Sequence, residues 1–172
     1  RQKGTSTMDI ITNVLAAFGL SSSAGLNAYL PLLVVALTAR YSDLIQLKDP
    51  WNALENPWII GVLVVLLIIE FFADKVPAVN HANDVIQTFV RPTAGAVLFA
   101  ASTGVVSNIH PVLALGLGLF TAGAVHTAKS VLVRPAVTAT TAGAANPVVS
   151  VAEDIVALLL SVVAVALPVL LS

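Results

Sequence analysis

The sequence predicts an all-α integral membrane protein, a polytopic bundle of about five transmembrane segments in a single domain. Hydrophobic residues make up 58% of the 172 residues, charged residues make up only 10%, and the mean hydropathy is +0.95. Soluble domains contain about 45–50% apolar and about 25% charged residues. The chain is therefore too apolar for a water-soluble globule, and disorder needs the opposite composition.

Charge and cysteine content exclude several function classes. The formal net charge is −1, so no strongly basic surface is available for nucleic acid. The chain has no cysteine, which excludes disulfides, thiolate metal sites and a cysteine nucleophile. The partner that the composition does indicate is the lipid bilayer.

The N-terminal residues 1–7 (RQKGTST) are polar and precede Met8. We interpret them as a remnant of expression and assign residues 8–172 to the transmembrane domain. A cleaved signal peptide is the rival interpretation, because small residues follow the first apolar run. Against it, the chain becomes apolar again at once, from Tyr29 to Ala39.

The first predicted segment is Asp9–Ala39, which exceeds the about 20 residues that a spanning helix needs. It is interrupted by the polar stretch Ser21–Asn27 and by Pro31. It is therefore either one long broken helix or two half-helices. The polar stretch Arg40–Pro57 contains Trp51, and tryptophan prefers the membrane interface, so we expect an interfacial loop there.

The remaining four segments are separated by polar stretches. They are predicted at Trp58–Ala73, Pro92–Ser107, Val112–Ala128 and Ser150–Leu171. Lysine and arginine favour the cytoplasmic side, and the positions predicted to lie inside are Lys75, Arg91, Lys129 and Arg134, against Arg40 and Lys48 outside. We therefore expect the N-terminus inside and the C-terminus outside.

Short repeats suggest an internal duplication. The tetrapeptide TAGA occurs at 93–96, 121–124 and 141–144, and VRP occurs at 90–92 and 133–135. Each VRP is expected to lie between two segments, which gives two related helical hairpins, 58–107 and 112–171. Many transporters are built from such repeats, although low complexity in an alanine-rich chain could produce the same matches.

Small residues recur every fourth position at Ala96, Ala100 and Gly104. Small residues let membrane helices approach closely, so helix packing is the simplest explanation. Because five short helices enclose little interior, we expect a homo-oligomer that packs partly through this face. A small-residue lining of a narrow pathway is the alternative.

Ionisable residues carry the strongest functional signal. Charged groups in an apolar span are costly and usually face a cavity or a partner. The segments predicted above place such groups at one level near the inner leaflet, namely Glu70, Asp74, Lys75, His126, Lys129, Glu153 and Asp154. The alternative is that they are interfacial charges that form structural ion pairs.

A second polar group comprises Ser22, Ser23 and Asn27 in the first segment, with Asn146 before the last. Unwound backbone at membrane depth can bind ions through carbonyl groups. A serine-rich kink is the alternative.

No motif of a hydrolase, metalloprotease or nucleotide-binding enzyme is present, so we expect neither an enzyme nor a cofactor. Histidines and carboxylates leave metal binding open.

Several runs together resemble the uncharacterised bacterial membrane family "domain of unknown function 4126". They are EFFADKVP from Glu70, TFVRPTAGA from Thr88, GLNAYLP from Gly25, HTAK from His126, and Asn146-Pro147 with Ala152-Glu153-Asp154. The resemblance covers nearly the whole chain from Met8. It implies a small multi-helix protein of the bacterial inner (cytoplasmic) membrane, and it names no substrate.

We therefore expect a small transporter or channel for an ion or small solute. Glu70, Asp74, His126, Lys129 and Glu153 would surround one polar site. Arg91 and Arg134 would close its inner rim. Proton exchange by one carboxyl, relayed by His126, would couple transport to protons. The alternative is a membrane scaffold or accessory subunit without transport activity.

Overall fold

The computed structural model describes residues 7–73, 77–104 and 109–171, and over these residues the protein is helical, with no strand. Three described helical runs are long and apolar enough to cross a membrane, namely Thr7–Leu26, Pro111–Thr141 and Asn146–Leu171. The predicted all-α membrane bundle is thereby confirmed. The elements are α1 (Thr7–Leu26), α2 (Tyr29–Tyr41), η1 (Trp51–Glu55), α3 (Pro57–Ala73), α4 (Pro77–Gly104), α5 (Pro111–Ala128), η2 (Lys129–Val133), α6 (Arg134–Thr141) and α7 (Asn146–Leu171).

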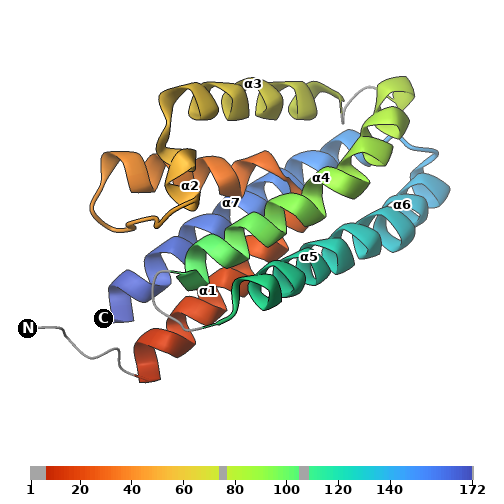
Figure 1. Cartoon of the computed structure of the whole chain (residues 1–172). Helices are drawn as coiled ribbons and strands as arrows, with labels where there is room; N and C mark the ends of the chain where they lie inside the picture. Colours follow the sequence, from red (N-terminus) through yellow and green to blue (C-terminus); the bar gives the residue numbers. More distant parts are fainter. Residues whose placement is uncertain (1–6, 74–76, 105–108, 172) are drawn as a thin grey trace, which may run out of the picture.

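The interrupted first segment forms two helices that run in opposite directions (Figure 1). Asn27 produces the break, because its side-chain Oδ1 accepts the backbone N–H groups of Tyr29 at 3.1 Å and Leu30 at 3.0 Å. These donors at the start of α2 would otherwise lack a partner. After α2 the chain returns to the start of α1, where Leu44 and Asn13 line one small cavity of about 90 Å³.

This hairpin changes the expected topology. Because α2 runs back along the bundle and the later helices alternate in direction, the start of α1 and the end of α7 lie at the same end of the bundle (Figure 1). The expectation that they lie at opposite ends is therefore wrong. Asp9–Ala39 was counted as one crossing, although Asn27 ends one helix and starts the next.

Helix α1 forms the centre of the bundle, with α4, α5 and α7 around it (Figure 1). The rings of Phe18 on α1 and Phe99 on α4 meet edge to face, with centroids 4.9 Å apart. On the α7 side, a Cβ on Gly19 would lie 3.0 Å from Ala164. Side chains three to four residues apart share one face of a helix, so each face of α1 packs on a different neighbour.

Two glycines bring α4 and α5 into backbone contact. A Cβ on Gly95 would collide with the side chain of Ala122, and one on Gly118 would collide with the carbonyl oxygen of Gly95. The small residues Ala96 and Ala100 are also buried inside the chain, at 6% and 4% exposure. The prediction that their face joins two copies of the protein is therefore wrong, because α5 already covers it.

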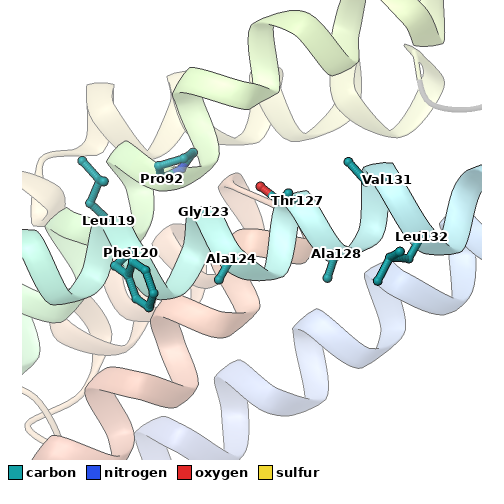
Figure 2. Close-up of a pocket in the computed structure, with 9 residues that line it drawn as sticks. All are labelled: Pro92, Leu119, Phe120, Gly123, Ala124, Thr127, Ala128, Val131 and Leu132. Atoms are coloured by element: carbon teal, nitrogen blue, oxygen red, sulfur yellow. The ribbon is translucent and has the colours of Figure 1, made fainter.

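The two VRP motifs do not lie at turns. Arg91 and Pro92 are inside α4, and Arg134 and Pro135 continue the helical run from α5 into α6. Pro135 occupies the first turn of α6, where a missing N–H costs little. Pro92 lies over Gly123 of α5, beside an outward-facing apolar groove (Figure 2). The expectation that each VRP lies between two segments is thus wrong, and duplication stays a prediction.

We expect Gly118→Ala to destabilise the bundle by about 1–3 kcal/mol, because the added methyl group has no room between α4 and α5. Gly116→Ala is the matched control two residues away on the same helix, where a Cβ would meet nothing within 4 Å. It should be neutral or slightly stabilising, by up to about 1 kcal/mol. Unfolding followed by circular dichroism in mild detergent measures both, and equal effects would contradict the close packing.

Candidate functional site

The buried charged side chains gather at the level where α1 ends and α2 begins. We call one group the Glu70 cluster, which comprises Tyr29, Glu70, Gln87, Thr88, Arg91 and His126. We call the other the Lys129 cluster, which comprises Asp84, Lys129, Arg134 and Glu153. Their members come from α2, α3, α4, α5, η2, α6 and α7.

Arg91 is the centre of the Glu70 cluster and is 0% exposed. Its Nη2 donates to Oε1 of Glu70 on α3 at 2.8 Å. Its Nη1 lies 3.3 Å from Nδ1 of His126 on α5. One guanidinium of α4 therefore binds both neighbouring helices, and Glu70, at 1% exposure, is as deeply buried as its partner.

The hydrogen bonds assign the tautomer of His126. A guanidinium has only donors, so Nδ1 of His126 must accept from Arg91. The proton then resides on Nε2, which lies 3.2 Å from Oγ1 of Thr88. Thr88 is free to accept it, because its own hydroxyl donates to the carbonyl oxygen of Asp84 at 2.8 Å. His126 is thus neutral in this arrangement, and a second proton would remove its bond to Arg91.

Two further side chains complete the cluster. The hydroxyl of Tyr29 is hydrogen-bonded to Gln87 and lies in the field of Glu70 and Arg91. Gln87 is 1% exposed, and its Oε1 has no hydrogen-bond partner among the described residues. A buried acceptor without a partner is uncommon in proteins. The Oε1 atom of Gln87 therefore marks a polar position in the same cluster as the Glu70–Arg91 ion pair.

The Lys129 cluster lies on the α7 side. Nζ of Lys129 donates to the carbonyl oxygen of Leu26, the last residue of α1, at 3.0 Å, and pairs with Oε2 of Glu153 at 2.7 Å. A cation at a helix C-terminus compensates the unpaired carbonyl groups there. Lys129 begins the π-helical turn η2, a type of turn that is frequent at functional sites.

Arg134 closes this cluster on its outer side. Its guanidinium lies 3.6 Å from Oε2 of Glu153 and 3.4 Å from Oδ1 of Asp84 on α4. Both distances are longer than the Lys129–Glu153 contact. The outer pairs are therefore the looser part of the cluster.

A row of polar contacts runs down the α1–α7 interface. Oγ of Ser23 donates to the carbonyl oxygen of Ala157 at 2.7 Å and lies 2.8 Å from Oγ of Ser161. Just beyond the C-terminal end of α1, Nδ2 of Asn27 donates to Oδ1 of Asp154 at 2.9 Å. These bonds satisfy the polar side chains of Ser23 and Asn27 within the bundle.

The structure brings together most of the residues that the sequence marked. Glu70, Arg91 and His126 meet in one cluster, and Lys129, Arg134 and Glu153 meet in the other. Arg91 lies at the centre rather than at the rim. Asp74 and Lys75 lie outside the described residues.

Other marked residues lie elsewhere. Asn146 begins α7 and donates to Thr138 of α6 at 3.0 Å, so it belongs to the turn between those helices rather than to either cluster. Ser22 is half-buried on α1 and forms no side-chain hydrogen bond with the described residues. The site predicted from the sequence did not include Tyr29, Asp84, Gln87 or Thr88. The spacing of Gln87 and Thr88 to Arg91, four and three residues, places them on its helix face and was the available signal.

No group of three or more histidine and carboxylate side chains within the described residues could hold a metal ion. The arrangement instead offers proton chemistry. It holds a neutral imidazole, a buried carboxylate and a phenol around one permanent cation.

Comparison with known proteins gives one match. The model of the family described as "Domain of unknown function (DUF4126)" matches residues 14–172. No curated protein and no solved structure matches the chain.

We expect Glu70→Gln and Arg91→Met each to cost about 3–5 kcal/mol, because each leaves the other charge buried without its partner. The double variant should cost less than the sum of the two, by about 1–3 kcal/mol. A double-mutant cycle on unfolding in detergent measures the difference. Arg40→Gln serves as the control, because it removes an exposed cation that donates to the carbonyl oxygen of Glu55 and lies over the ring of Tyr41, outside both clusters. Strictly additive effects would show that the ion pair has no coupling energy.

Proposed function

This chain belongs to the DUF4126 family, and we propose that it is a small transporter or channel of the bacterial inner membrane that carries an ion or small solute. The Glu70 cluster is its proposed proton-sensitive site. The family description assigns no activity. The proposal therefore depends on the chemistry of the site.

The observation that carries the proposal is the bond between Arg91 and the unprotonated Nδ1 of His126. Proton uptake on Nδ1 turns an acceptor into a donor that faces a guanidinium. Two cationic groups then repel each other, and Arg91 must turn toward Glu70 or away from both. The proton state of one histidine is thus linked to the ion pair that joins α3 to α4.

Helix α3 is the element that such a change would move. Within its described residues only Leu63 and Glu70 are buried, whereas Trp58 is 83% exposed and Phe72 is 62% exposed. Figure 1 draws α3 over α2, at the edge of the bundle. A helix with few buried contacts moves at low cost, so loss of the Glu70–Arg91 bond would release α3 first.

The alternative is a membrane scaffold or accessory subunit. The exposed apolar side chains of α3 favour it, because a helix with so little contact inside its own chain could pack against another protein or a second copy. In that case the charged clusters would serve only to join helices.

Flux through liposomes separates the two functions. We expect purified protein to carry at least one member of a panel of ions and small metabolites when a proton gradient is imposed. Glu70→Gln should abolish the dependence on the gradient, because it keeps the size of the side chain but removes its titration. A pH-sensitive dye inside the vesicles reports the proton movement.

The matched control is Asp43→Asn, which neutralises an exposed carboxylate in the loop after α2 and should leave the flux unchanged. Transport would be contradicted if no solute moved in the wild-type protein. If Glu70→Gln lowered the melting temperature without altering any flux, the scaffold function would be preferred.

A further inference from the structure

We propose that the small cavity lined by Asn13 and Leu44 binds a monovalent alkali cation through neutral oxygen atoms. The cavity has a volume of about 90 Å³ and lies between α1, α4, α7 and the stretch that follows α2. A water molecule takes up about 30 Å³ in the liquid, so the cavity has room for an ion with a few water molecules. It shares no residue with either charged cluster, and the proposal does not rest on the proposed transport function.

The lining of the cavity combines polar and apolar side chains. Asn13 on α1, Ser102 on α4 and Gln46 after α2 are its polar members, and none of its described lining residues is ionisable. The larger groove beside α5 provides a contrast, because Thr127 is the single polar side chain among the described residues that line it (Figure 2). Lipid chains suit that groove, whereas polar groups from two helices and a loop meet in the cavity.

The hydrogen bonds of Asn13 and Ser102 leave oxygen lone pairs available. Nδ2 of Asn13 donates to the carbonyl oxygen of Asp9 at 2.6 Å, which fixes the orientation of the amide because a carbonyl only accepts. Its Oδ1 then has no donor among the described residues. Oγ of Ser102 donates its hydrogen to the carbonyl oxygen of Leu98 at 2.8 Å. Both oxygen atoms can therefore only accept a hydrogen bond or coordinate a cation.

Pro168 releases a third oxygen atom at the same cavity. It lies inside α7 and has no N–H, so the carbonyl group of Ala164, four residues earlier, loses its usual helical donor. Both residues line the cavity, and Ala164 is only 5% exposed. A buried carbonyl group without a donor is unfavourable. A cation that coordinates this oxygen would compensate for the missing hydrogen bond.

Neutral oxygen atoms from several helices favour a monovalent cation. Sites for Ca²⁺ and Mg²⁺ usually contain carboxylates, and no carboxylate is among the described residues that line this cavity. In membrane transporters, carbonyl groups released from regular helical bonding coordinate Na⁺. The low dielectric constant of a buried site strengthens the attraction between an ion and these dipoles. An anion would face the negative ends of the same dipoles and would be repelled.

Thermal unfolding of the full chain in nanodiscs of neutral phosphatidylcholine tests the proposal. NaCl replaces N-methylglucamine chloride at constant ionic strength, so that only the cation changes. We expect Na⁺ to raise the melting temperature in a saturable manner, because a ligand that binds only the folded chain stabilises it. Scintillation proximity with radioactive sodium measures the same binding directly and should also saturate.

Pro168→Ala separates cation binding from a defect in folding. Alanine restores the N–H that the carbonyl group of Ala164 lacks, so the variant should melt at a higher temperature than the wild-type protein without Na⁺. Its sodium binding should nevertheless weaken about tenfold, because the oxygen is no longer available. Ser102→Ala removes another coordinating oxygen and should weaken sodium binding to a similar extent.

Thr93→Ala is the matched control, because the hydroxyl of Thr93 also lies on α4 and donates four residues back, to Phe89 at 2.7 Å, outside the cavity. It should bind sodium as the wild-type protein does. Equal melting temperatures in both chloride salts would overturn the proposal and show that the cavity holds water only. Wild-type sodium binding by both Pro168→Ala and Ser102→Ala would also overturn it. Either result would leave the flux experiment unaffected, since that experiment depends on Glu70.

Discussion

The guanidinium of Arg91 is the constraint on which the rest of the structure depends. It is fully buried in a membrane bundle and cannot lose its charge, so the helices around it must supply acceptors. Helix α3 supplies Glu70, and α5 supplies the unprotonated nitrogen of His126. The position of α3 and the tautomer of His126 both follow from this one requirement. Because α3 buries few other side chains, the ion pair is also its main attachment to α4.

Run length and composition were enough to predict a helical membrane bundle, because a spanning helix must be long and apolar. The same reasoning misjudged two regions. Helix α2 has 13 residues, too few for a separate crossing, so its hairpin with α1 was merged into one segment. Arg91 was placed in a loop because polar residues surround it in the sequence, yet α4 continues through it and buries it.

The candidate site was partly predictable. The level of Glu70, His126, Lys129 and Glu153 followed from their distance to the ends of apolar runs. Pairing could not be predicted, because it depends on the rotation of each helix. The direction of the Ala96 and Ala100 face was likewise undetermined, since a stripe of small residues packs equally well inside a chain or between chains. Asn146 was misplaced because the sequence does not show that α6 extends the preceding helix.

The break between α1 and α2 holds the start of α2 close to the first turns of α7. Asn27 connects them, because it starts α2 next to Tyr29 and also binds Asp154. A movement of α7 that draws Asp154 away from Asn27 would therefore disturb the start of α2, where Tyr29 lies in the field of Glu70 and Arg91. This gives a physical route from α7 to the Glu70 cluster.

The central claim is that protonation in the Glu70 cluster frees α3 from α4. Because the sequence has no cysteine, spin labels can be attached to cysteines introduced at the exposed positions Ile69 on α3 and Phe89 on α4. A second labelled pair, Leu119 on α5 and Val163 on α7, serves as the reference. Pulsed electron–electron double resonance in nanodiscs should give a narrow α3–α4 distance at pH 8 that shifts or broadens at pH 5, with the reference pair unchanged. An α3–α4 distance that stays narrow and unmoved at both pH values would contradict the account.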